Sequence, residues 1–395
     1  MPMRFLYFLP ILCVLLVAEE DKFWDYNSCK ECHSEQVALW SSSWHSNSHI
    51  EKNELYAQSI KIVAKQANKK EEDIILQCGT CHNPHLDVKQ IDDDYKYAKM
   101  FNFETDKTIL IDKALQAKHI LGGISCYVCH RIESIKENRN PKTDFGYKAI
   151  SWASGDTIVG PFSESGRTNF HKSVQKQHFI KGDEICLVCH QGQGGVNELS
   201  MYNTGEESQN INNKKRCIEC HMGSSYETIN APKTNANLAL IRLNRPHLFM
   251  AGRNLALLKT SFDIKFNKQT NVLNLKNNIS HNIPTGFGSR MILIKINFYT
   301  GDNLITTENH YIRTLYENEY GTTLSYIATK IKENRVFKPF EERDIQIYPP
   351  KVCDKISVTL EYYFIDPSVA KDLNLKLSDT FTKPQIMFHK FFDLK

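Results

Sequence analysis

Five copies of one short cysteine motif constrain the fold of this chain more than any other feature. Ten of its 12 cysteines lie in Cys-x-x-Cys-His sequences. In this motif the two thiols add across the vinyl groups of a porphyrin and the next histidine binds the iron, so the chemistry requires both the spacing and the histidine. The sequence therefore predicts five covalently attached haem c groups. The attachment cysteines would be Cys29, Cys32, Cys78, Cys81, Cys126, Cys129, Cys186, Cys189, Cys217 and Cys220, and the proximal ligands His33, His82, His130, His190 and His221.

Other uses of paired cysteines explain the pattern less well. A redox Cys-x-x-Cys needs no histidine after it, and zinc sites would join such pairs into fours, which five separate motifs do not do evenly. A disulfide framework accounts for an even number of cysteines but not for the histidine after each pair. Cys13 and Cys353 stand alone and are interpreted as structural or incidental.

The N-terminus has the composition of an export signal. Arg4 precedes an apolar run from Phe5 to Ala18, and a charged stretch follows. The run is shorter than the roughly twenty residues that span a bilayer, which favours a cleaved signal peptide over residues 1–18. An uncleaved N-terminal anchor is the alternative. Export agrees with the haem hypothesis, because c-type attachment is completed outside the cytoplasm, and it predicts a periplasmic or otherwise exported protein. No later stretch is apolar enough to cross a membrane, so membrane association would not involve a further span.

Length and patterning predict two domains of an α+β protein. All five motifs precede residue 255 of the 395-residue chain. We expect residues 19–255 to form a mainly helical, loop-rich pentahaem domain whose haems serve as the core. Beyond residue 255 apolar residues alternate with polar ones around Phe262–Phe266, Ile292–Phe298 and Ile356–Tyr362. This period of two predicts a small antiparallel β-sandwich over residues 256–395.

The haem region contains two helical stripes and one long stretch without cysteine. Apolar spacing of three or four predicts helices over residues 55–67 and 110–121, the second ending at Gly122 and Gly123. Residues 134–167 are rich in Gly, Pro, Ser and Asn, and we expect a long loop there.

The charge balance excludes one class of function. The formal net charge is +4, and the propionates of five haems would outweigh it. The sequence has no basic stripe, and the net charge with haems attached would not be positive. Both observations argue against nucleic-acid binding.

Four further elements, in this order along the chain, resemble segments of the multihaem cytochrome c-554 family in its larger form with a C-terminal β-domain. They are Trp40-Ser-Ser-Ser-Trp44-His45, Gly160-Pro-Phe162 with Phe170-His171-Lys-Ser173, His247-Leu-Phe249-Met-Ala-Gly252-Arg-Asn254, and His281-Asn-Ile-Pro-Thr-Gly286. The resemblance covers residues 27 to at least 300. It implies that His45, His171, His247 and His281 are distal haem ligands.

The fifth distal ligand is open. His119 is placed best, seven residues before Cys126 at a helix end, and His85, His49 and His178 are the alternatives. His310 and His389 lie far into the expected β-domain and are interpreted as packing residues. Trp40, Trp44 and Tyr127 could stack on haem faces, although buried aromatic packing is the default interpretation.

The number of protein ligands on each haem iron distinguishes two possible functions. Haem iron bound by histidine on both faces is closed to substrates and suited to electron transfer, whereas a five-coordinate iron can bind a small molecule. The supply of histidines favours a non-catalytic electron carrier whose partners are redox proteins, such as other cytochromes or a membrane quinol-oxidising complex. The alternative is a multihaem oxidoreductase acting on a small nitrogen or sulfur compound at one open haem, which polar residues such as Arg131, Lys176 or Arg245 would line. A third hypothesis assigns the β-domain to docking on a membrane or partner complex.

Overall fold

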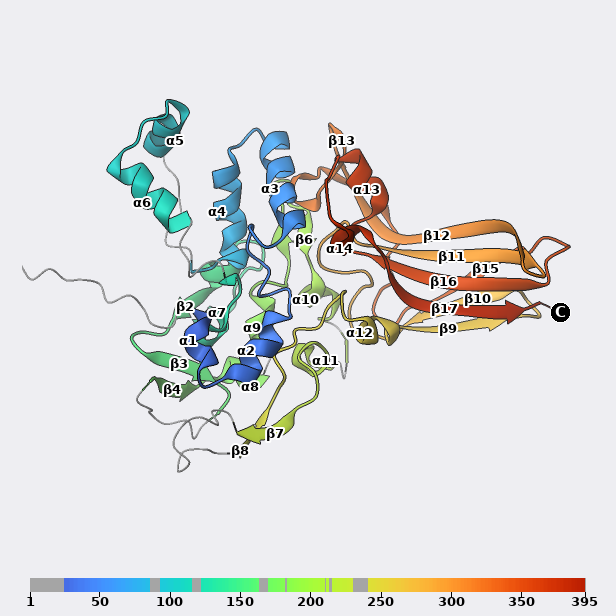
Figure 1. Ribbon diagram of the computed structural model, residues 1–395, viewed down its shortest axis with the longest axis horizontal. Coiled ribbons are helices and arrows are strands. Elements are labelled where there is room, and N and C mark those ends of the chain that lie inside the picture. Colours follow the sequence, from blue (N-terminus) through green and yellow to red (C-terminus); the bar gives the residue numbers. More distant parts are fainter. Residues whose placement is uncertain are drawn as a thin grey trace, which may run out of the picture.

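The computed structural model describes residues 25–394 apart from 86–92, 116–121, 163–169, 182, 210, 213–214 and 230–240. The expected signal peptide, Cys13 and His119 therefore lie outside the described residues. Figure 1 shows a region of short helices and hairpins joined to a region of long strands. The mixed α+β prediction is confirmed.

The first region is built mainly of short helices, and each of the five motifs begins on one of them. The helices of this region are α1 (Tyr26–Lys30), α2 (Ser34–Ser41), α3 (Glu54–Gln66), α4 (Glu71–His82), α5 (Asp93–Met100), α6 (Asp106–Leu115), α7 (Cys126–His130), α8 (Gln177–Lys181), α9 (Glu184–Leu187), α10 (Thr204–Glu207) and α11 (Cys217–His221).

Helix α3 confirms the first predicted helix, although its most buried face is shifted from the predicted apolar stripe and shares only Val63 with it. Asn53 caps its start by accepting a hydrogen bond from the Tyr56 N–H. Tyr56, Ile60, Val63 and Ala64 are buried on one face, as the helical period requires. The second predicted helix begins earlier than expected, because α6 covers Asp106–Leu115, and its predicted end at 116–121 is outside the described residues.

The expected long loop at 134–167 is partly wrong, because short strands and a 3₁₀ helix interrupt it. Residues 132–135 pair with 150–152, and 157–160 pair with 172–175. These strands are too short for the period of two to appear in the sequence. The small pairs of this region are β1 (Ile132–Ile135) with β2 (Ile150–Trp152), β3 (Thr157–Gly160) with β4 (Lys172–Gln175), β5 (Gln193–Gly194) with β6 (Ser200–Tyr202), and β7 (Tyr226–Ile229) with β8 (Ile241–Asn244), and the 3₁₀ helix is η2 (Gly146–Ala149).

The second region holds two antiparallel sheets, as the alternating pattern predicted. One has the order β15-β10-β9, and the other the order β13-β12-β11-β16-β17, with β14 paired to β12. The elements of this region are α12 (Leu255–Lys259), β9 (Phe262–Asn267), β10 (Val272–Asn277), β11 (Met291–Thr300), β12 (Asn303–Asn318), β13 (Gly321–Thr323), η4 (Ser325–Ile327), β14 (Lys330–Asn334), β15 (Glu342–Gln346), β16 (Lys355–Tyr363), α13 (Pro367–Asp372), α14 (Asp379–Thr382) and β17 (Gln385–Asp393).

Two apolar clusters hold these elements together. The larger joins both sheets through side chains such as Leu273, Ile294 and Val358, each almost fully buried. The smaller joins α3 and α4 to the sheet region, because Ile60, Val63 and Ile74 contact Leu324, Ile365 and Val369.

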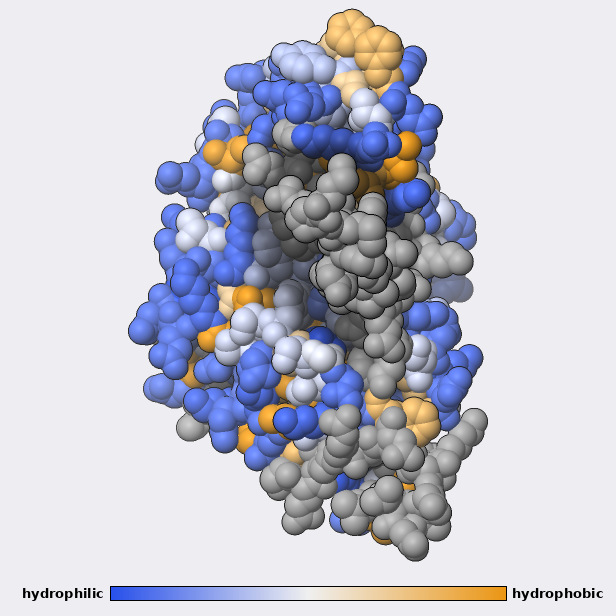
Figure 2. All heavy atoms as spheres, turned by 90° about the vertical axis from the view of Figure 1, so that its left-hand side faces the viewer, coloured by the Kyte–Doolittle hydropathy of each residue, from blue (hydrophilic) through white to orange (hydrophobic). Residues whose placement is uncertain are grey.

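Figure 2 shows the face of the molecule that lies on the left in Figure 1. The face is mostly hydrophilic. Apolar side chains gather at its upper end, where α5 and α6 lie and where Met100, Phe101 and Phe103 are exposed. Among the described residues, no helix combines the length and the apolar character needed to cross a membrane.

Candidate haem site

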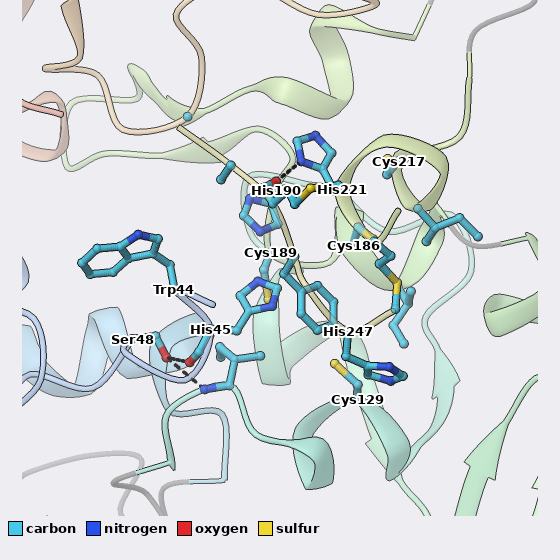
Figure 3. Close-up of a pocket in the computed structure, with 18 of the residues that line it drawn as sticks. Trp44, His45, Ser48, Cys129, Cys186, Cys189, His190, Cys217, His221 and His247 are labelled. Carbon is cyan, nitrogen blue, oxygen red and sulfur yellow. Dashed lines mark hydrogen bonds between the residues drawn. The ribbon is translucent and has the colours of Figure 1, made fainter. Parts of the chain in front are cut away.

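All five motifs open into one large cavity. Its volume is about 1830 Å³, well above the roughly 300–1,000 Å³ of a pocket for one drug-sized ligand. All ten motif cysteines and all five motif histidines line it, and so do His45, His171, His247 and His281. Figure 3 shows several of these side chains turned toward a shared space. The structure therefore brings together every predicted site residue except His119.

Three pairs of imidazoles face one another across this cavity. The ring centres of His45 and His190 are 6.3 Å apart, those of His130 and His247 6.2 Å, and those of His221 and His281 6.2 Å. A metal between two imidazoles lies about 2.0 Å from each ligating nitrogen, and each nitrogen lies roughly 1.1 Å from its ring centre, so the centres should be about 6.2 Å apart. Each pair thus leaves the space that one iron atom needs.

Backbone carbonyls orient most of these rings through Nδ1. The Nδ1 of His82 lies 3.0 Å from the Ser48 oxygen, that of His130 2.7 Å from the Val159 oxygen, and that of His281 2.9 Å from the Asn282 oxygen. His221 makes the same contact with Met250, and His247 makes it with Arg245. A carbonyl only accepts, so Nδ1 carries the proton and Nε2 is left with a lone pair for a metal.

Burial lowers the pKa of several of the facing imidazoles and so favours their neutral form. Burial, and then the charge of neighbouring histidines, lowers the pKa of His45 to about 3 and that of His190 to about 4. Burial also lowers the pKa values of His247 and His281 to about 4, because a low-dielectric environment disfavours the charged ring. A neutral imidazole is the form that binds iron.

Contacts between thiols show which motifs are neighbours. Cys29 is hydrogen-bonded to Cys126, Cys81 to Cys189, and Cys186 to Cys217. Cys129 lies close enough to Cys189 that the charge of Cys189 raises the pKa of the Cys129 thiol, in addition to the larger effect of burial. The first motif therefore lies beside the third, the second beside the fourth, the third near the fourth, and the fourth beside the fifth. None of the described cysteines forms a disulfide.

The chemistry of the cavity wall fits haem. Among the described residues that line it, five are cationic, namely Lys215, Arg216, Arg242, Arg245 and Arg290, and only Glu31 and Asp183 are acidic. Such a balance suits the negative propionates of the porphyrin. The wall is otherwise largely apolar, and the buried Tyr56 hydroxyl on it has no hydrogen-bond partner from the described chain. The described residues contain no cluster of three or more His, Cys, Asp or Glu arranged for a bare metal ion.

None of the three described alternatives for the fifth distal ligand lines the cavity. His49 is buried and accepts a hydrogen bond from the Glu51 N–H. His85 stacks on Trp152, and His178 is buried beside Phe179. His119 lies outside the described residues, so its role stays a prediction.

The remaining histidines and aromatic residues have structural contacts. His310 contacts Glu308, and His389 contacts Thr359. Trp40 and Trp44 line the cavity, but Trp40 also donates to the Ile124 oxygen and Trp44 lies under the Arg253 guanidinium at 3.6 Å. Tyr127, also on the wall, contacts His85.

Two of the three polar residues suggested for an open haem do not line the cavity. Arg131 donates to the carbonyls of Gly155 and Ala153. Lys176 pairs with Glu133, and only Arg245 is on the wall.

Several wall residues had no signal in the sequence. Tyr56 stacks on His82 with ring centres 4.1 Å apart. The β-region contributes Leu324, Ser325, Tyr326 and Tyr362 to the wall. These positions become neighbours of the motifs only through tertiary packing, which local spacing does not encode.

The segments that carried the family resemblance have physical roles here. Gly252 is required because a Cβ would lie 2.4 Å from the Tyr362 hydroxyl, and Asn254 caps α12 by accepting from the Leu257 N–H. Gly286 has φ of 81° and lies against Arg290.

Comparisons with known proteins agree with this geometry. Residues 28–131 match the family described as cytochrome c554 and c-prime. No curated protein matches the chain in sequence. A penta-heme cytochrome c552 from Thermochromatium tepidum shares the fold, with a TM-score of 0.68 and 16% identity over 92% of this chain and 97% of that chain. The matched segment and the shared fold show that this chain is similar to the multihaem cytochromes of the c-554 type.

Proposed function

We propose that this chain is an exported pentahaem c-type cytochrome that transfers electrons, with most of its haems held by two histidines. The observation that carries the proposal is the set of three imidazole pairs, 6.2–6.3 Å between ring centres, inside a cavity that all five motifs line. The cysteines of each motif would form two thioether bonds by adding S–H across vinyl groups, and the adjacent histidine would bind the iron.

The chain's own residues then do three things. The paired histidines would supply both ligands of a haem iron, and the backbone carbonyls at Nδ1 hold the rings of His130 and His281 in place. The apolar wall keeps water away, and its cations balance the propionates. Iron with two histidine ligands exchanges electrons and does not bind substrate.

The neighbour relations of the motifs support transfer along a chain of haems. The thiol contacts connect the first motif through the third and fourth to the fifth, with the second beside the fourth. Electrons would pass between redox partner proteins, such as other cytochromes or a membrane quinol-oxidising complex. Export is supported by the apolar run before residue 19 and by the site of c-type attachment.

Electron paramagnetic resonance of the oxidised holoprotein tests the proposal. We expect signals of low-spin ferric haem for at least three of the five irons. Addition of nitrite, hydroxylamine or cyanide should leave these signals unchanged. Mainly high-spin iron would contradict the proposal, and a high-spin signal that shifts with these ligands would favour the oxidoreductase.

A further inference from the structure

Helix α10 is fixed tightly to the fourth motif. The Gly205 N–H donates to the His190 carbonyl at 3.0 Å. A Cβ at Gly205 would lie only 2.7 Å from the Leu187 side chain, so the helix lies directly on α9. Any group at the end of α10 therefore has a defined position relative to His190.

Glu207, the last residue of α10, connects this helix to the loop that contains His281. Its carboxylate oxygen Oε2 accepts from the Asn282 N–H at 3.0 Å and from the Thr285 hydroxyl at 2.7 Å. The Thr204 and Thr285 hydroxyls lie 2.9 Å apart and add a second contact between helix and loop. The two segments are more than 70 residues apart in the chain.

The same loop orients the His281 ring. The His281 Nδ1 donates to the Asn282 carbonyl at 2.9 Å, so Glu207 and His281 hold opposite ends of residue 282. Arg290 donates to the Thr285 carbonyl at 2.8 Å and supports the loop from its other side. The ring then faces His221 at 6.2 Å with 19° between the planes.

We propose that Glu207 is a positioning residue, which holds His281 at the ligating distance from the iron of the fifth motif. Through α10 it also ties this site to the backbone of the fourth motif. The inference rests on the proposed ligation of that iron by His221 and His281. Hydrogen bonds to the groups behind a ligating histidine fix the ring and tune the metal.

Three variants of the full-length holoprotein test the inference by electron paramagnetic resonance. Glu207→Ala removes both acceptor bonds and should produce up to one more high-spin haem per chain than the wild type. Glu207→Gln keeps an oxygen acceptor and should retain the wild-type spectrum. Glu206→Ala is the matched control, because Glu206 is an exposed acid on the same helix, and it should also leave the spectrum unchanged.

The variant His281→Ala distinguishes ligation by His281 from positioning by Glu207. If it adds one high-spin haem and Glu207→Ala adds none, the positioning role is wrong while the ligation stands. If it adds none, the ligation proposal fails and the role of Glu207 fails with it. A Glu207→Gln spectrum like that of Glu207→Ala would also contradict the role, because the hydrogen bonds would then not be the cause.

If Glu207→Ala folds poorly, a milder variant tests the same inference. Thr285→Val keeps the side-chain shape and removes the hydrogen bond to Glu207 together with the contact to Thr204, whereas Thr204→Val removes the second contact alone and is its control. On heating, a high-spin signal from the fifth haem should appear at a lower temperature in Thr285→Val than in the wild type. The same temperature in both proteins would overturn the proposal.

Discussion

At the scale of single residues, His130 and His247 show how a facing pair is prepared for a metal before the metal binds. The ring of His130 is held through Nδ1 by the Val159 carbonyl, and burial lowers its pKa. His247 is held by the Arg245 carbonyl, and burial lowers its pKa to about 4. A fixed, neutral ring loses little rotamer freedom on ligation and has no proton to release.

Removal of one facing ring should open one iron. His247→Ala should convert one low-spin haem to high-spin, because the His247 ring centre lies 6.2 Å from that of His130. The Soret and resonance spectra of the oxidised protein measure this change. His389→Ala is the control, since its ring contacts Thr359 in the β-region. Identical spectra for the two variants would contradict the assignment of His247.

Site residues could be predicted from the sequence where their chemistry is local. The spacing of Cys78, Cys81 and His82 is a requirement of haem attachment and can be read without a structure. His281 was predicted from a family resemblance, and the structure places it in the cavity. Glu207 was missed because its role depends on contacts with residues 282 and 285, which only the fold brings near.

At the scale of elements, α3 joins the motif region to the sheets. Its buried face contacts Leu324 and Val369, and its Gln66 side chain accepts from Thr323 at 2.6 Å. Helix α4, which carries the second motif, shares this cluster, because Ile74 is fully buried in it. The sheet region is therefore part of the wall behind the second motif.

Truncation in this cluster should destabilise the junction. Ile60 is 1% exposed, so Ile60→Ala should lower the stability of the holoprotein by about 2–5 kcal/mol through lost burial and a residual cavity. Thermal unfolding followed by circular dichroism measures the effect. Ile331→Ala, at a position 45% exposed, should change stability by no more than about 0.5 kcal/mol. Equal effects of both substitutions would show that α3 does not support the junction.

Elements with a long apolar period were predictable, and short ones were not. The alternation in β11 appears in the sequence because mainly one face of this long strand is buried. In β16 apolar and polar residues also alternate, although Ser357, Thr359 and Glu361 on its polar face are buried as well. Strands β1 to β4 have only three or four residues each, so the segment around them had the composition of a loop. Their pairing depends on contacts such as Ile132 with Trp152, which sequence spacing does not specify.

At the scale of the whole molecule, the cavity takes the place of a conventional core for the first region. The two larger apolar clusters lie in the sheets and at their junction with α3 and α4, and among the described residues the first region has by itself only the small cluster of Leu76, Tyr95 and Ile111. The motif helices α1, α7, α9 and α11 have five residues or fewer and enclose the cavity. Helices this short are marginal by themselves, so packing on a large apolar group would stabilise them.

Five porphyrins attached through thioether bonds would remain on the denatured polypeptide, so the mass of the intact chain decides whether they are present. The protein is purified under native conditions, denatured in acid to release every non-covalent group, and weighed by mass spectrometry. We expect the mass of the exported chain plus five haem groups. The mass of the bare polypeptide would contradict it.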